Sequence, residues 1–534
     1  YILDDSWRIY SIDLYITKKQ NINFVDTLKI SEQFFPVTQK IWLPSSIKFE
    51  FTAGLFGFKV GGYYISLYKD YALEPKFTKN EFAEVIRITR GINKKDSVFW
   101  ENERPIPLTE EEKTDYRKKA ILAKKRESKS YLDSLDNVHN KFDLNKFFFR
   151  GYHHSDRYKH EYYDLDPLAN IKGFNTVEGF TLNYGASYRK RVDSLNNRFL
   201  FLGARAGYGY SDHILTGGVN GSVPIGSFTL NFNAGSEIVD LNNTVPISPF
   251  VNSLYSLFER QNFEKLYHKQ FISVTLHKRI AGGWQAIAGT EWADRKWLPN
   301  SSSYSFYKPR NRNYTSNNPF TPTQDISLFA ENQSFKVILR TTYDFSNKYE
   351  TYPNGRRYLP SSYPTIGLNY TKGVKNLLGS NVDYDLVSAD ISKSDISMGI
   401  FGRTSFFIGA GKFLNNNSLF YPDYKQFAGN EVLFYKGGIA SFLLLNYYIF
   451  STPDQYIEGH FEHNFSGFIL NKLPLIRKLK LQEVVDVNYL STPRLKNYTE
   501  FGFGIQYLNF RLMYGTSFNS GNKINSAFRI RLAF

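Results

Sequence analysis

The clearest signal in the sequence is a period-two alternation of apolar and polar residues at its end. Within Asn525 to Phe534 the apolar positions are Phe528, Ile530, Leu532 and Phe534, and Ala527, Arg529, Arg531 and Ala533 lie between them. A strand with this period has one apolar and one polar face. The pattern predicts a strand between lipid and a polar lumen that Arg529 and Arg531 face, and a terminal Phe is typical of bacterial outer-membrane barrels.

The same alternation recurs from about Lys146 onward. The two-faced segments include 180–189, 200–210, 228–237, 272–277, 335–345, 499–507 and 510–518. Soluble sandwiches also alternate, but their strands average about 5–6 residues. These segments reach roughly ten residues or more, as tilted membrane strands require. We count about sixteen strands; the apolar run Phe442 to Phe450 is a candidate further strand that would change the parity.

The connections between these strands alternate in length. Short ones are 191–197, 224–227 and 281–283, and long ones are 241–269, 298–333 and 414–453. Tight periplasmic turns and long outer loops are the habit of outer-membrane barrels. An even strand count places both barrel ends on the periplasmic side.

Two further regions precede the barrel. Residues 1–95 are rich in less strictly two-faced strands, which predicts a small periplasmic β domain. Residues 96–145 hold a stiff segment, 104–108, and then an amphipathic helix that Thr109 and Glu112 begin as a capping box. The predicted fold class is therefore all-β: a transmembrane antiparallel β-barrel of about sixteen strands (146–534), a small N-terminal periplasmic β domain and a linking helix.

Composition agrees with a barrel and argues against a helical membrane protein. Aromatic residues make up 17% of the chain, with 39 Tyr and 47 Phe, as lipid-facing strands and interfacial girdles require. No apolar run reaches the ~18 residues of a spanning helix. The chain has 0 Cys, so disulfide and thiol chemistry are excluded. It opens at Tyr1 in folded-type sequence, and we expect a signal peptide, with or without a further domain, to precede that residue.

The formal net charge is +16. Lys and Arg are scattered and form no basic stripe among exposed aromatics, which argues against a nucleic-acid partner. Cations that meet the phosphates of outer-membrane lipid and lipopolysaccharide, or that line a lumen, explain the charge better. An AT-rich genome with many Lys and Asn codons would give the same composition.

Few residues suggest chemistry, and no cofactor is implied. Hydrolase, zinc-protease and phosphate-loop motifs are missing from the sequence. His153, His154, His160 and Glu161 share a short polar stretch, where a surface loop competes with a metal site. Glu458, His460 and Glu462 share the polar face of one strand, where a lumen network competes with a bound cation. Asn471 to Leu479 predicts a short basic helix at a turn, placed at the membrane surface or used for docking.

Six short segments carry a family resemblance: Phe99-Trp100, Arg104 to Thr109, Asn140 to Phe142, Phe174 to Phe180, Glu462 to Phe465 and Asn471 to Leu479. Together they resemble a Bacteroidota outer-membrane barrel family that often carries a carboxypeptidase-regulatory-like domain and has no assigned activity. The resemblance covers most of the chain from Phe99 to the end. It implies an integral outer-membrane protein with a domain ahead of the barrel.

The last third is also similar to the barrel-assembly and polypeptide-transport superfamily. Tyr498 to Ile505, Phe510 to Leu512 and the terminal strand are similar to its last three strands. In that superfamily an outer loop folds into the lumen and carries an Arg-Gly element. Here Phe427, Gly429 and Asn430 lie in the corresponding loop, but the Arg is missing, which counts against insertase or translocase activity. Residues 1–95 also lack convincing polypeptide-transport-associated repeats.

Three functions compete at this point. The first is a non-catalytic component or scaffold of an outer-membrane biogenesis complex, with partner proteins. The second is an outer-membrane pore or transporter, because about sixteen strands leave room for a channel. The third is a membrane enzyme, which no triad or dyad in the sequence supports.

Overall fold

The computed structural model describes residues 1–4, 7–18, 25–55, 58–78, 81–89, 91, 95–103, 107–168, 170–193, 198–346, 348–353 and 355–532. The terminal Phe534, the segment 104–106 and the turn 194–197 lie outside these residues. The chain forms two compact units. One unit holds Tyr1–Phe82, Gly91–Thr114 and Ile469–Leu481, and the other holds Ala83–Arg90, Asp115–Phe468 and Gln482–Phe534.

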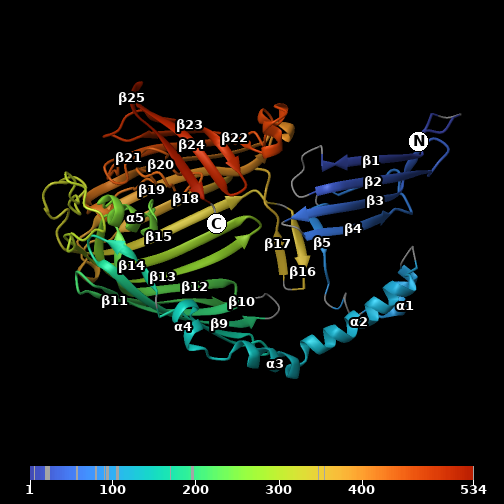
Figure 1. The fold of residues 1–534 in the computed structure, drawn as a ribbon, viewed down its shortest axis with the longest axis horizontal. Coiled ribbons are helices and arrows are strands. Elements are labelled where there is room, and N and C mark those ends of the chain that lie inside the picture. Colours follow the sequence, from blue (N-terminus) through green and yellow to red (C-terminus); the bar gives the residue numbers. More distant parts are fainter. Residues whose placement is uncertain are drawn as a thin grey trace. The chain divides into compact units, whose positions relative to one another are not determined.

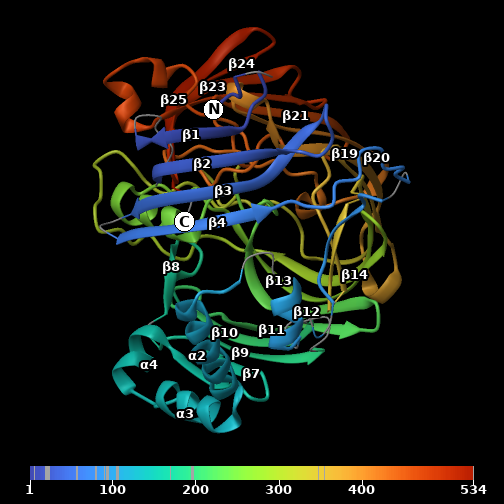
Figure 2. The same ribbon diagram turned by 90° about the vertical axis from the view of Figure 1, so that its right-hand side faces the viewer.

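The first unit contains a four-stranded antiparallel sheet (Figure 2). Its strands lie in the order β1 (Ser11–Thr17), β2 (Val25–Pro36), β3 (Trp42–Leu55) and β4 (Phe58–Leu67). No described side chain of residues 1–82 is buried. A sheet normally buries one face against a second layer, so this sheet is a single layer without a core of its own among the described residues.

Residues 84–87, expected to belong to the first domain, pair elsewhere. Strand β5 (Glu84–Arg87) runs parallel to β16 (Tyr349–Tyr352), which forms a hairpin with β17 (Gly355–Tyr358). This small sheet belongs to the second unit. Backbone pairing thus ties the end of the first region to a hairpin between two barrel strands.

The described residues before the barrel strands form four helices: α1 (Ser97–Glu103), α2 (Glu110–Glu127), α3 (Lys129–His139) and α4 (Leu144–Arg150). The Thr109–Glu112 capping box is present, with Thr109 N donating to Glu112 Oε2 at 2.9 Å and Glu112 N to Thr109 Oγ1 at 3.2 Å. The single predicted helix is two helices, because the Ser128 hydroxyl accepts from Tyr131 N and begins α3. No described residue of α2 is buried, so its predicted apolar face is unpacked. Within the described residues, no helix is both long and apolar enough to cross a membrane.

The prediction of a large antiparallel barrel is confirmed. Figure 1 shows the long strands from β9 to β25 side by side. Among the described residues, eighteen strands follow one another in chain order around the barrel, with β16 and β17 left out. They are β6 (Tyr152–Asp156), β7 (Glu161–Leu165), β8 (Ile171–Asn175), β9 (Gly179–Asp193), β10 (Arg198–Gly209), β11 (Leu215–Ile225), β12 (Phe228–Asp240), β13 (Leu266–Ala281), β14 (Trp284–Trp297), β15 (Asn332–Asp344), β18 (Thr365–Gly373), β19 (Asp383–Ser397), β20 (Arg403–Ser418), β21 (Gln455–Asn464), β22 (Gln482–Ser491), β23 (Tyr498–Tyr507), β24 (Phe510–Asn519) and β25 (Asn522–Leu532).

The number is eighteen rather than about sixteen because the first strands are short. Strands β6, β7 and β8 have five residues each, too few to show a clear alternation. Both β7 and β8 pair with the fifteen-residue β9, through Tyr163↔Tyr188 and Phe174↔Phe180. The run Phe442 to Phe450 forms no strand. It is apolar because it lies buried inside the barrel, as described below.

The barrel wall has an apolar outer face and a polar inner face. On β23, Phe501 and Phe503 are 51% and 61% exposed, whereas Glu500 between Thr499 and Phe501 is 0% exposed. On β25, Phe528 is exposed and Arg529 is buried. Apolar side chains outside and charged ones inside are the reverse of a soluble barrel. The wall is therefore suited to lipid on its outside.

The lipid-facing assignment gives a first prediction. Phe503 lies near the middle of β23 with its ring exposed. An Arg at the midplane of a membrane barrel costs about 2–4 kcal/mol. We expect Phe503→Arg to lower the urea stability of the folded protein in lipid vesicles by that order, and Phe503→Leu to change it little. Equal stability of the two variants would mean that this face meets water or protein.

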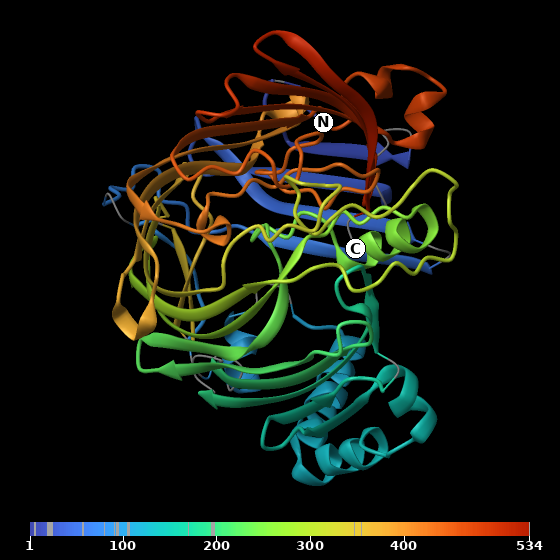
Figure 3. The same ribbon diagram turned by 90° about the vertical axis from the view of Figure 1, so that its left-hand side faces the viewer.

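Short helical turns occupy the loops. They are α5 (Pro249–Leu254), η3 (Tyr255–Glu259), η4 (Leu377–Gly379), η5 (Gly399–Phe401), η6 (Tyr421–Asp423), η7 (Leu470–Lys472) and η8 (Ile476–Leu479). The helix predicted over Asn471 to Leu479 is thus a pair of 3-10 turns. The three longest connections run between β12 and β13, β14 and β15, and β20 and β21. Figure 3 shows these loops, in green, lime and orange, crossing the space enclosed by the curved strands.

Candidate functional site: the filled lumen

The connection between β20 and β21, residues 419–454, folds into the barrel; we call it the lumen loop. Its buried side chains join three apolar clusters with residues of the barrel wall. Phe442, Leu445 and Tyr447 are 0%, 1% and 1% exposed. A run this apolar is stable in a polar lumen only where it packs against other apolar side chains. The loop therefore provides its own core within the barrel.

Glu500 of β23 fixes the centre of the lumen loop. Its carboxylate accepts from the backbone N–H groups of Leu443 at 2.6 Å and Leu444 at 2.8 Å. Asn488 Nδ2 at 3.1 Å and the Tyr498 hydroxyl at 2.6 Å donate to the same group. Four donors satisfy a carboxylate that water does not reach. One wall residue thus binds two consecutive amides of the loop.

Asp423 of η6 fixes the start of the loop through charges. Its Oδ1 lies 2.7 Å from Arg295 NH1 of β14 and 3.2 Å from Lys336 Nζ of β15. Burial raises the pKa of Asp423, but Arg295 and Lys336 outweigh burial and lower that pKa to about 2. The network continues through Glu291, which accepts from Lys269 at 2.7 Å. The Asp423 carboxylate is thus charged at any physiological pH, and it holds the lumen loop against β14 and β15.

The lumen loop also pairs with the last barrel strand. Phe434 and Ile530 form a parallel bridge. Ile530 N donates to Leu433 O at 2.8 Å, and Tyr435 N donates to Ile530 O at 3.0 Å. Strand β25 pairs on its other edge with β24, and in the strand order it meets β6 at the barrel seam. At Ile530, therefore, the edge of β25 is occupied by the chain's own loop.

The residues singled out in the sequence as an inward-folding loop lie inside the barrel. Phe427 is 3% exposed and packs edge-on against Tyr456. Asn430 is 2% exposed and donates to Val432 O at 2.8 Å. Gly429 is a position that only Gly fits, because a Cβ there would lie 2.4 Å from Leu445 O. These three residues belong to one packed turn.

The polar face of β21 is used for anchoring. Glu458 accepts from Lys425 Nζ of the lumen loop at 2.7 Å. Glu462 forms two bonds with Arg511 of β24, at 2.5 and 2.9 Å. His460 Nδ1 lies 2.8 Å from Asn488 Oδ1. The three side chains share one face: His460 Nε2 also lies 3.8 Å from Glu458 Oε2, whereas Glu462 pairs with Arg511.

The two terminal arginines contact the loop as well. Arg529 Nε donates to Leu443 O at 2.8 Å. Arg531 lies beside Gly437, where a Cβ would meet the arginine Cδ at 2.3 Å. The histidine stretch is separate from this site: His153 pairs with Asp164, and His160 contacts Arg191. Within the described residues no three His, Asp or Glu side chains converge as a metal site.

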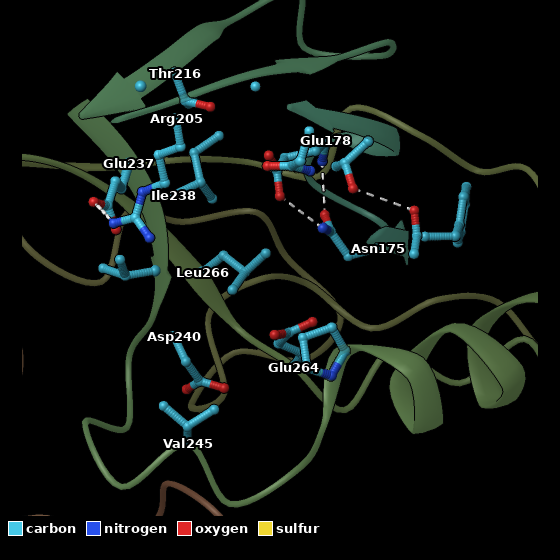
Figure 4. A pocket seen from close by; sticks show the side chains of 18 of the residues that line it. Asn175, Glu178, Arg205, Thr216, Glu237, Ile238, Asp240, Val245, Glu264 and Leu266 are labelled. Atoms are coloured by element: carbon cyan, nitrogen blue, oxygen red, sulfur yellow. Dashed lines mark hydrogen bonds and ion pairs between the residues drawn. The ribbon is translucent and has the colours of Figure 1, made fainter. Parts of the chain in front are cut away.

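A cavity of about 250 Å³ lies beside the wall strands β10 to β13 (Figure 4). Four carboxylates line it, from Glu178, Glu237, Asp240 and Glu264, together with Arg205. Arg205 pairs with Glu237, and Asp240 accepts from the Tyr448 hydroxyl. The acidic side chains thus support the wall and the lumen loop.

The sequence did not single out the main anchors. Glu500 and Arg295 are polar residues at inward strand positions, where a group facing water gives the same alternation, and Asp423 lies in a loop without any periodic pattern. The one usable signal is that Glu500 carries a full charge on a strand whose other inward neighbours include Gly502 and Tyr498.

The fold and the filled lumen define an outer-membrane barrel protein. The chain belongs to the "Family of unknown function (DUF5686)": residues 145–505 match its C-terminal domain and residues 1–71 match the family model. Comparison with curated proteins gives no match.

Three solved structures with similar folds are barrels. BamA from Haemophilus ducreyi lacking POTRA domains 1-3 is 12% identical, with 70% of each chain covered and a TM-score of 0.37. CdiB from Acinetobacter baumannii is 13% identical, with 66% of this chain and 57% of that chain covered and a TM-score of 0.34. A mutant Rh. blastica porin is 8% identical, with 66% and 90% covered and a TM-score of 0.28.

Proposed function

We propose that this protein is a non-catalytic component or scaffold of an outer-membrane biogenesis complex. The observation that carries the proposal is the filled lumen. Glu500, Arg295 and Glu458 each bind the lumen loop from a different part of the wall. A barrel closed in this way offers its surfaces to partners rather than a path for solutes.

The sheet β1–β4 supports a role with partners. On β4, Phe58, Val60 and Tyr64 are 77%, 61% and 63% exposed. Exposed apolar surface of this kind marks interaction sites. We infer that a protein partner covers this sheet, and that the sheet lies in the periplasm.

The alternative function is a pore or transporter. Eighteen strands enclose enough space for a channel, and the 250 Å³ cavity shows that the lumen is incompletely packed. Conduction would require the lumen loop to leave its anchors. We therefore rank this function second. The lipid and lipopolysaccharide contacts suggested by the net charge of +16 apply equally to both functions.

Purification of the full chain from mild-detergent membranes tests the proposal. We expect partner proteins to co-purify with the wild type in constant proportion. The double variant Phe58→Ser/Val60→Ser should lose them, whereas Lys59→Ser, on the opposite face of β4, should retain them. A protein that purifies alone, and that conducts steadily in a planar bilayer, would contradict the proposal and favour the pore.

A further inference from the structure

A second cavity, of about 390 Å³, lies among the long loops, and most of its charged lining residues are cations. The connections β12–β13, β14–β15 and β20–β21 all contribute to it. Its charged lining residues are Arg260, Lys265, Arg312 and Glu431. We call it the loop cavity. It is separate from the 250 Å³ cavity and shares no lining residue with it.

Lys265 is a buried cation without a carboxylate beside it. It is 5% exposed, and its Nζ donates to Thr315 Oγ1 and to Ser316 O, both at 2.7 Å. Both acceptors are neutral, and the carboxylates that act on Lys265, those of Glu431, Asp325 and Asp240, do so without a hydrogen bond to it. Burial lowers the pKa of Lys265 to about 7, against the weaker influence of Glu431, Asp325 and Asp240. A buried cation of this kind gains most from an anion placed next to it.

Arg260 presents a second unused donor. It ends η3 in the left-handed conformation, with φ of 57°, and its guanidinium lies 5.8 Å above the Tyr314 ring. Its Nε is buried without a hydrogen-bond partner in the structure. Buried donors are almost always bonded. An unbonded Nε at the wall of a cavity therefore points to an acceptor supplied from outside the chain.

The carboxylate that lines the loop cavity, that of Glu431, already accepts hydrogen bonds from the protein. Glu431 accepts from Asn446 Nδ2 at 2.8 Å and from Tyr447 N at 3.1 Å. Arg312 is exposed at the rim, where its NH1 donates to Glu259 O at 3.0 Å and lies 3.9 Å from Glu259 Oε2. With the Lys265 ammonium charged, three cations face the two carboxylates of Glu431 and Glu259. The remaining positive charge suits an anionic ligand.

We propose that the loop cavity binds a phosphate group carried on a sugar. Arg and Lys together favour phosphate, because guanidinium groups bind its oxygens in pairs and an ammonium adds a point charge. A cavity of about 390 Å³ is far larger than a phosphate needs, given that one water occupies about 30 Å³. The amide of Gln261 and the rings of Phe263 and Pro319 line the remainder and suit a sugar.

Calorimetric titration of the full chain in detergent tests this site. We expect glucose 1-phosphate to bind and glucose not to bind. Arg260→Gln and Lys265→Gln should each lower the affinity for glucose 1-phosphate by at least about tenfold, which is about 1.4 kcal/mol of binding free energy. The matched control Lys308→Gln removes an exposed charge of the β14–β15 connection outside the cavity and should leave binding unchanged.

Vesicles with and without lipid A distinguish two sources of the phosphate. If phosphorylated lipid A competes with glucose 1-phosphate and dephosphorylated lipid A does not, the sugar phosphate belongs to lipopolysaccharide. If neither competes, the ligand is a soluble phosphosugar. Two results would overturn the proposal: no saturable binding of either phosphate source by the wild type, or wild-type affinity in a folded Arg260→Gln protein. The Arg260 variant keeps the test valid should Lys265→Gln fail to fold.

Discussion

Replacing Glu500 with alanine is expected to release the lumen loop and to open the barrel. The change leaves the amides of Leu443 and Leu444 without their acceptor in a buried environment. Each buried unsatisfied donor costs about 1–3 kcal/mol, so we expect a loss of about 3 kcal/mol or more in the free energy of unfolding. In a planar bilayer the variant should show intermittent conductance that the wild type lacks.

The adjacent Thr499→Ala variant is the control for this experiment, because Thr499 lies on the same strand and is not buried. It should behave as the wild type in both stability and conductance. If Glu500→Ala stays closed and as stable as the wild type, the two amides are not what holds the loop. Measuring stability and conductance on the same preparation separates release of the lumen loop from unfolding of the whole barrel.

Replacing Asp423 with asparagine is expected to cost about 3–5 kcal/mol, the usual price of removing one partner from a buried ion pair. Arg295 is 1% exposed, and Lys336 shares the same carboxylate oxygen. Both cations would stay buried, with Glu291 the one carboxylate left within 4.0 Å of Lys336 in the described network. Urea unfolding followed by tryptophan fluorescence measures the loss.

Asp395→Asn is the matched control for the charge. Asp395 lies on β19 and is 75% exposed, with Arg403 at 4.0 Å. Exposed pairs contribute about 0–1 kcal/mol. We therefore expect a difference of several kcal/mol between the two Asp→Asn changes. Similar small effects for both would mean that water reaches Asp423 and that the start of the loop is not sealed.

The barrel could be predicted from the sequence because its signal is repeated on every long strand. Phe528 and Arg529 alternate at the end of the chain as Phe501 and Glu500 do on β23, and each pair has one exposed and one buried member. Strands of five residues, such as β6 and β7, carry too few alternations to be counted. The helix split at Ser128 depends on one hydroxyl and was not visible in the apolar pattern.

The lumen loop was harder to predict, and for a physical reason. Its apolar run Phe442 to Phe450 has the composition of a strand, since both a membrane strand and a buried plug exclude water. Only the contacts distinguish them, and the contacts come from residues far away in the chain, such as Glu500 and Asn242, whose Nδ2 donates to Tyr447 O at 2.6 Å. Which wall residues meet the loop is decided only when the barrel closes, so the local sequence does not indicate it.

Hydrogen–deuterium exchange of the full chain in lipid nanodiscs tests the central claim most directly. The amides of Leu443, Leu444 and Tyr435 are bonded to Glu500 or to β25. The account predicts that peptides covering 433–445 exchange as slowly as those of β23. Exchange of these peptides within seconds, with the barrel strands still protected, would show a loop that lies in water and would contradict the filled lumen.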